Sequence, residues 1–134
     1  MPKAVLGHQL LVEFFDCSPA LLDDANYVRE AMLDAAKATG ATVVGELIHQ
    51  FNPYGVSGVI VIAESHFAIH TWPEYCYAAV DLFTCGDEID PHRGFEVLKK
   101  RLEAESFDIT AVERGLLSRR GEVLPHKPQV TENA

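Results

Sequence analysis

The sequence predicts an α+β fold: a two-layer α/β sandwich in which a largely antiparallel sheet carries two helices on one face. Its apolar segments follow the order β-α-β-β-β-β-α-β. Successive strands joined by short turns are not parallel neighbours, because a parallel crossover needs a dozen or more residues. The chain's 134 residues fit one domain.

The N-terminal part predicts a strand, a helix and a second strand. Residues 8–15 alternate between two faces, as a strand does. Ser18 and Pro19 then give a helix start, and Gly40 gives its end. The apolar stripe of this helix is Leu21, Ala25, Val28, Met32 and Ala35. Residues 41–51 form the next expected strand.

The rest of the chain predicts four strands and a second helix. After a turn at Pro53, Tyr54 and Gly55, the expected strands are 56–63, 66–72 and 75–83. Asp90 and Pro91 begin the second helix, and its lysines near the C-terminal half suit the helix dipole. The last expected strand is 107–113.

We expect a single domain over residues 1–117 and a flexible C-terminal tail over 118–134. Segments 59–63 and 78–83 carry apolar residues on both faces of the sheet. Helices on one side leave the other face uncovered, and an apolar uncovered face implies a partner. The sequence therefore predicts a homodimer that packs sheet against sheet, in four layers αββα.

Composition narrows the class of function. A net charge of −9 repels phosphate backbones, so nucleic acid is not an expected partner, whereas a cationic small ligand is mildly favoured. Three cysteines without a CxxC spacing argue against a disulfide framework or a zinc knuckle. We expect a cytoplasmic protein, because no signal peptide or membrane-spanning stretch is present.

Reactive side chains are densest between residues 57 and 85, and they allow several interpretations. A metal site would use His66 and His70, but on a strand these lie about 13 Å apart, so no metal is expected. A hydrolase would use Cys85 with His70, but the acidic residues after Cys85 disfavour its thiolate. Taken singly, each cysteine or histidine, including Cys17, Cys76 and His49, is more simply a structural residue.

A fourth interpretation starts at Glu64 and Ser65, which interrupt an apolar run in VIVIA-ES-HFAIH. The stretch GVSGVIVIAESHFAIHTWPEYCYAAVDLFTCG, at residues 55–86, strongly resembles the prokaryotic pyruvoyl-dependent S-adenosylmethionine decarboxylases. HQLLVEFFDC, FNPYG and VERG extend the resemblance over nearly the whole chain apart from the tail.

The resemblance implies a proenzyme that cuts itself between Glu64 and Ser65, into a β chain of residues 1–64 and an α chain of residues 65–134. Ser65 would attack the Glu64 carbonyl, and elimination followed by loss of ammonia would leave a covalent pyruvoyl group. Ser57 and His70 match the processing pair. An imidazole titrates near neutrality and can move the proton, while a hydroxyl can stabilise an oxyanion.

The resemblance also implies the mature chemistry and its partners. The pyruvoyl carbonyl would form a Schiff base with the substrate amine and act as the electron sink, without pyridoxal phosphate or a metal. Cys85 matches the proton donor. Glu74 matches the carboxylate that holds the ribose, and Phe51 the aromatic that stacks on adenine. In the family, two α/β heterodimers associate, and each active site draws on both protomers.

Two alternatives stay open beside S-adenosylmethionine decarboxylation for polyamine (spermidine) biosynthesis. One keeps the pyruvoyl chemistry but acts on ornithine or arginine; the presence of Phe51 and Glu74 favours the nucleoside substrate. The other is an unprocessed, non-catalytic relative; intact Ser57, Ser65 and His70 argue against it. The chain departs from the family pattern at Cys76, where glycine is usual.

Overall fold

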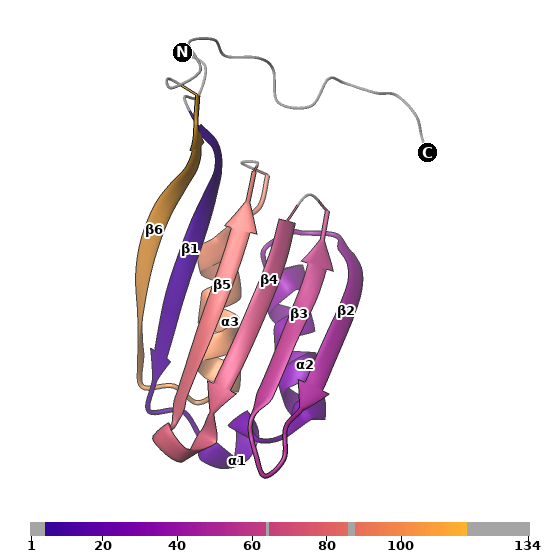
Figure 1. Ribbon diagram of the computed structural model, residues 1–134, viewed down its shortest axis with the longest axis vertical. Helices are drawn as coiled ribbons and strands as arrows, with labels where there is room; N and C mark the ends of the chain where they lie inside the picture. The colour runs from indigo at the N-terminus through magenta and orange to yellow at the C-terminus, as the bar shows by residue number, and fades with distance from the viewer. Residues whose placement is uncertain (1–4, 64, 86–87, 118–134) are drawn as a thin grey trace.

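The computed structural model describes residues 5–63, 65–85 and 88–117, and within them the predicted sandwich is confirmed. The described chain forms a six-stranded sheet in the order β2-β3-β4-β5-β1-β6, and every neighbouring pair is antiparallel (Figure 1). The strands are β1 (Val5–Phe15), β2 (Val43–Gln50), β3 (Val56–Ile62), β4 (Ser65–Trp72), β5 (Tyr77–Thr84) and β6 (Ser106–Leu116).

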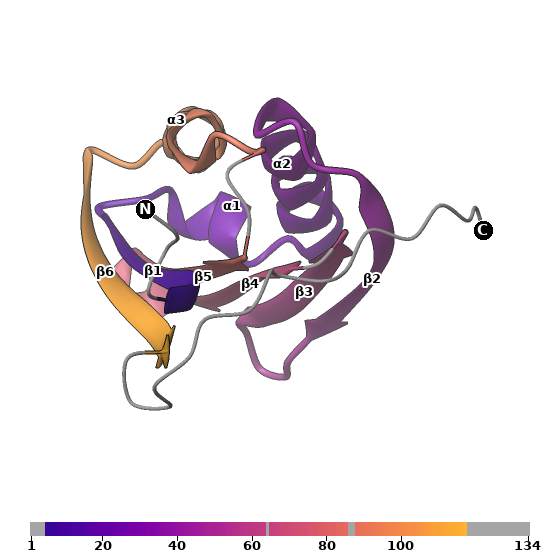
Figure 2. The same ribbon diagram turned by 90° about the horizontal axis from the view of Figure 1, so that it is seen from above.

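Two long helices lie on one face of this sheet, as Figure 2 shows in the view along the layers. The helices are α1 (Pro19–Leu22), α2 (Ala25–Ala38) and α3 (Pro91–Arg101), with a short 3-10 helix, η1 (Pro73–Tyr75). Their apolar sides bury against the sheet. The largest side chains of this core are Phe14, Phe67, Phe95, Leu22 and Met32, all fully buried.

The prediction of one helix from Pro19 to Gly40 is wrong, because the chain breaks into α1 and α2. Asp24 adopts extended backbone (φ −109°, ψ 100°), and its carboxylate accepts a hydrogen bond from the Tyr27 N–H at 3.0 Å. An aspartate is a preferred N-cap, so it starts a new helix within an apolar pattern that runs on without interruption. The predicted ends hold: Ser18 caps α1, and Gly40 has φ 92° after α2.

Strands β1 and β6 are longer than the sequence predicted. β1 begins at Val5 and β6 ends at Leu116, because the two pair along almost their whole length. Pairing adds backbone hydrogen bonds that no side-chain pattern reports. The expected tail at 118–134 lies outside the described residues. No helix in the described parts is long and apolar enough to cross a bilayer.

The face of the sheet away from the helices carries exposed apolar side chains, as the sequence predicted. Within the described residues, the most exposed on the strands of this face include Leu47 (71%), Val61 (43%) and Trp72 (40%). We call this surface the open face. Both faces of the sheet therefore carry apolar residues, although helices cover just one of them.

Candidate active site

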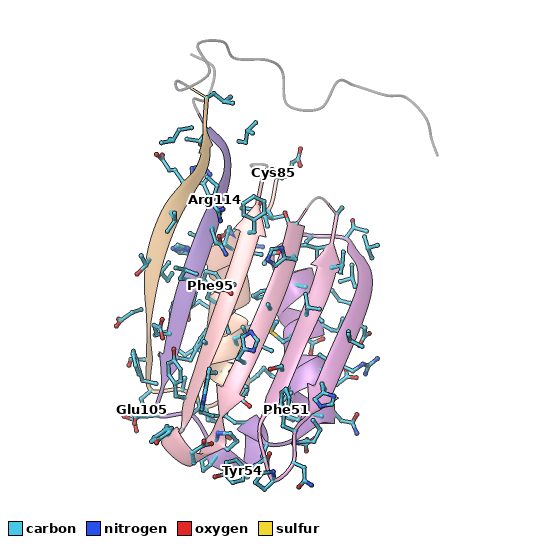
Figure 3. All side chains as sticks on the ribbon, in the orientation of Figure 1. Phe51, Tyr54, Cys85, Phe95, Glu105 and Arg114 are labelled. Atoms are coloured by element: carbon cyan, nitrogen blue, oxygen red, sulfur yellow. The ribbon has the colours of Figure 1, made fainter. Side chains whose placement is uncertain are left out.

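The predicted site residues form two clusters at opposite ends of the sheet. Ser57, His70, Phe51 and Glu74 gather at the end where β2 turns into β3, and we call them the lower cluster. Ser65 and Cys85 lie where β4 begins and β5 ends, and we call them the upper cluster. Figure 3 shows this separation, with Phe51 at one end of the molecule and Cys85 at the other.

A hydrogen bond joins Ser57 and His70 in the lower cluster. The two residues face each other across β3 and β4, and Ser57 Oγ lies 2.8 Å from His70 Nδ1. Strand alternation puts both side chains on the open face, since their neighbours Gly58 and Ile69 are buried toward the helices. This is the pair that the sequence singled out for processing.

The Ser57–His70 pair opens onto a pocket of about 320 Å³. Leu47 and His49 of β2 line the pocket as well, and His49 stands directly opposite Ser57 in the strand register. The sequence assigned His49 a structural role, and the structure places it beside the predicted processing pair. Two features could have identified His49: it lies two residues before Phe51, and the β2–β3 register sets it opposite Ser57.

Phe51 follows β2 at the start of the β2–β3 turn. Its N–H donates to the Gly55 carbonyl at 2.8 Å, which closes the turn. The Gly55 N–H in turn donates to Asp23 at 2.8 Å, and Gln50 also donates to Asp23 at 3.0 Å. The turn is therefore tied to the α1–α2 junction, while the Phe51 ring itself stays 47% exposed.

Glu74 lies in η1 and lines a cavity of about 810 Å³. Asp23, Asp24 and Tyr54 contribute to the same wall. Three carboxylates and a phenol make this an acidic, partly aromatic cavity. Such a lining suits a cationic ligand with an aromatic part.

Thr71 anchors the lower cluster from inside the core. Its buried hydroxyl donates to the Leu22 carbonyl at 2.9 Å and accepts from the Val56 N–H at 2.9 Å. One side chain thus links α1, β3 and β4. Because Ser57 and His70 are the next residues along β3 and β4, this link fixes their backbones relative to each other.

The upper cluster is defined by register. His66 pairs with Phe83 across β4 and β5. Ser65, just before His66, and Cys85, two residues after Phe83, therefore lie at the same end of these two strands. Both are half-buried, and Ser65 is the first residue of β4. Glu64, the other half of the predicted cleavage site, lies outside the described residues.

The histidines of the metal interpretation, His66 and His70, share the open face of β4 on either side of Ala68. At the usual rise per residue they lie about 13 Å apart. In the parts of the chain that the structure describes, no three His, Cys, Asp or Glu side chains form a group that could hold a metal ion.

The other two cysteines lie together, away from both Ser65 and Cys85. The Cys17 N–H donates to the Cys76 carbonyl at 2.9 Å. Burial raises the pKa of the Cys17 thiol to about 12, with smaller contributions from Cys76 and Asp16. Cys17 is therefore a neutral, packed thiol, in agreement with its predicted structural role. Cys76 has left-handed backbone (φ 53°), which accounts for the glycine usual at this position in the resembling family.

The fold is an α+β sandwich, and the open face of its sheet carries a hydrogen-bonded serine–histidine pair. The chain matches the S-adenosylmethionine decarboxylase family over residues 8–115. Since the match covers most of its length, the chain belongs to this family.

Two individual relatives support this family membership. The chain is 50% identical over 127 residues to an S-adenosylmethionine decarboxylase proenzyme of Thermosipho melanesiensis, covering 93% of this chain and 98% of that relative. It is 51% identical over 115 residues to the proenzyme of Pseudomonas paraeruginosa, covering 86% and 72%.

Two solved structures share the fold. The adenosylmethionine decarboxylase of Aquifex aeolicus superposes with a TM-score of 0.76 at 29% identity, over 95% of this chain and all of that one. A Trypanosoma brucei AdoMetDC monomer superposes with a TM-score of 0.57 at 16% identity, over 76% of this chain and 44% of that one. The second likeness shows the fold alone.

Proposed function

We propose that this protein is a self-cleaving, pyruvoyl-dependent decarboxylase. It converts S-adenosylmethionine to S-adenosylmethioninamine and carbon dioxide, and so supplies aminopropyl groups for spermidine synthesis. The observation that carries the proposal is family membership over residues 8–115 together with the placement of Ser65 as the first residue of β4. The relatives at about half identity bear the name of this decarboxylase proenzyme.

The position of Ser65 suits a cleavage site. A cut before Ser65 falls in the β3–β4 connection, outside the strands themselves. The two strands remain paired from Ile62–Ser65 to Ser57–His70, so the sheet holds both new chain ends in place. The fragments 1–64 and 65–134 therefore stay together after cleavage without any covalent link.

Ser57 and His70 are the groups we assign to processing. The Ser57 hydroxyl and His70 Nδ1 share a hydrogen bond of 2.8 Å, which orients the imidazole and leaves Nε2 for the reacting atoms. His70 takes the proton that leaves Ser65 as the acyl shift proceeds. Ser57 donates to the oxyanion that develops on the Glu64 carbonyl oxygen.

The N-terminal pyruvoyl group derived from Ser65, when present, supplies the electron sink that decarboxylation needs. Cys85 lies at the same end of the sheet as Ser65. It is the group that we assign to return a proton to the substrate Cα. That step needs a neutral thiol. Neither step calls for pyridoxal phosphate or a metal.

Phe51 and Glu74 are the groups we assign to substrate recognition. Phe51 offers an aromatic ring, 47% exposed, on which adenine can stack. Glu74, on the wall of the acidic cavity, can accept hydrogen bonds from both ribose hydroxyls. A sulfonium cation is favoured in such surroundings. These contacts favour the nucleoside substrate over ornithine or arginine, which lack a base and a ribose.

One protomer does not bring its own two clusters together, so we propose that the active site is completed by a second copy. Ser65 and His70 are separated by about 16 Å along β4 at the usual strand rise. Two open faces packed about a twofold axis that runs across the strands place the upper end of one copy's sheet over the lower cluster of the other. Cys85 follows the open-face positions of β5, and Ser65, the first residue of β4, lies at the same end of the sheet. The exposed apolar side chains of the open face support this packing.

Intact-mass spectrometry under denaturing conditions tests the proposal. We expect fragments of residues 1–64 and 65–134, the second lighter by one ammonia than its sequence. Ser65→Ala should give a single uncut mass. Carbon dioxide release is then compared for S-adenosylmethionine, ornithine and arginine. An uncut wild-type chain overturns the proposal in favour of a non-catalytic relative, and preferred turnover of ornithine or arginine overturns the substrate assignment.

Cytoplasmic location is part of this proposal. A reducing compartment suits a chain whose Cys17 is a buried, neutral thiol.

A further inference from the structure

A histidine beside the lower cluster, His49, contacts the ring that the proposed function assigns to adenine. The His49 and Phe51 ring centroids lie 4.5 Å apart at an interplanar angle of 72°, an edge-to-face arrangement. Two residues along a strand are normally separated by about 6.6 Å. The rings therefore lean toward each other rather than standing parallel on the sheet.

This contact orients Phe51. Since Phe51 lies beyond the end of β2 in a turn, its side chain lacks neighbouring strand residues on one side. An edge-to-face contact with His49 occupies at most one face of the Phe51 ring, and 47% of the side chain stays exposed. The remaining face is open to a flat nucleobase, which aromatic rings favour as a stacking partner.

The alternative is that His49 takes part in self-cleavage. It stands opposite Ser57 in the register and lines the same pocket as His70. However, the hydrogen bond of Ser57 goes to His70 Nδ1, while the aromatic contact of His49 goes to Phe51. The geometry thus couples His49 to substrate binding rather than to the processing pair.

We infer that His49 is a positioning residue, which holds the Phe51 ring so that adenine stacks on its free face. This inference rests on the proposed function and extends it to a residue outside the predicted site. The aromatic ring of His49, rather than its ability to carry a proton, makes this contact, because the two rings meet edge to face. An aromatic pair contributes about 0.5–1.5 kcal/mol.

Three variants test this inference: His49→Ala, His49→Phe and the control His92→Ala. His92 is an exposed histidine in the helix layer that also contacts a phenylalanine, Phe95, at 6.3 Å. We expect all three to self-cleave like the wild type. In His49→Ala the KM for S-adenosylmethionine should rise roughly 2- to 12-fold with kcat nearly unchanged, which is the aromatic-pair energy converted to affinity. His49→Phe should restore the wild-type KM.

Binding of 5′-methylthioadenosine, measured by calorimetry, gives a readout that does not depend on turnover. We expect its Kd to weaken in His49→Ala by the same factor and to recover in His49→Phe. An unchanged KM and Kd in His49→Ala, slow self-cleavage in that variant, or failure of His49→Phe to rescue would each overturn the inference. A wild-type chain that neither cuts nor decarboxylates would overturn the proposed function instead, and the calorimetry would still decide the role of His49.

Discussion

Ser65 and His70 occupy one strand, β4, but lie at its opposite ends and on alternate faces of the sheet. Ser65 pairs with the buried Ile62, whereas His70 pairs with Ser57 on the open face. Their separation of about 16 Å along the strand exceeds any direct proton transfer. The proposed catalytic assignments therefore require a second copy, because one protomer keeps these two residues apart.

Co-expression of Ser65→Ala with His70→Ala tests this arrangement. Each variant alone should remain uncut, because every site lacks one of the two groups. In a mixed dimer, the Ser65 of the His70→Ala chain meets the intact His70 of the Ser65→Ala chain. We expect the His70→Ala chain to be cleaved in that case, which distinct affinity tags and intact-mass spectrometry would detect.

The control is co-expression of His70→Ala with a Ser65→Ala, His70→Ala double variant, in which no intact site forms. Cleavage of the His70→Ala chain alone would contradict the role of His70. Absence of cleavage in mixed dimers, shown to exist by tandem purification, would contradict the shared site.

Glu74→Gln tests ribose recognition. Replacing the carboxylate by an amide weakens its hydrogen bonds to the two hydroxyls, since hydrogen bonds to charged groups are stronger than those to neutral ones by about 1 kcal/mol. We expect the KM for S-adenosylmethionine to rise about fivefold or more, with self-cleavage unaffected. Steady-state kinetics on the fully cleaved variant measures this, and an unchanged KM would remove Glu74 from the site.

Thr71→Val tests the buried link beneath the lower cluster. Without its hydroxyl, the Val56 N–H and the Leu22 carbonyl lose their shared partner. Leaving buried polar groups unpaired costs about 1–3 kcal/mol. We expect Thr71→Val to lower the free energy of unfolding by this amount. Urea unfolding of the uncut Ser65→Ala background, at fixed protein concentration, measures it. Thr71→Ser keeps the hydroxyl and should retain most of the stability; equal losses in both variants would show that the methyl group, not the hydrogen bonds, matters.

The sequence predicted the order of strands and helices because apolar periodicity reports local structure. It did not predict the break at Asp24, because a helix cap inside a continuous apolar stripe leaves little trace in the apolar periodicity. It did not predict the full length of β6 either, because this length depends on pairing with β1. The site residues came from resemblance. Their division into two clusters, and the place of His49, depend on strand register, which follows from pairing across the sheet.

Cys76 stands where the family usually has glycine, and its left-handed backbone gives the physical reason for that glycine. A side chain at φ 53° is strained by roughly 1–2 kcal/mol relative to glycine. Part of this is offset because glycine gains more entropy in the unfolded chain, about 0.5–1 kcal/mol. We expect Cys76→Gly to be more stable than the wild type by about 0.5 kcal/mol. Cys76→Ser, which keeps the strained Cβ, is the matched control; equal stability of both variants would contradict the argument.

Tyr77 gives the protein a pH dependence at alkaline pH. Burial, followed by its hydrogen bond to Glu13 and the charges of Glu13 and Asp81, raises the pKa of Tyr77 to about 12, from 10.0. A pKa raised on folding stabilises the native state at low pH. The stabilisation is complete below about pH 10 and is lost as the pH rises toward 12. We expect the stability difference between wild type and Tyr77→Phe to shift in favour of the variant over this interval.

Urea unfolding at several pH values between 9 and 12, again in the uncut Ser65→Ala background, measures that difference. Tyr75→Phe, at a side chain that is 76% exposed, controls for the loss of a phenol. A Tyr77→Phe difference that stays constant across the interval would mean that the hydroxyl ionises equally well in the folded and unfolded chains. The contact with Glu13 would then make no difference to its ionisation, and the cross-strand pair on the open face would be a packing contact alone.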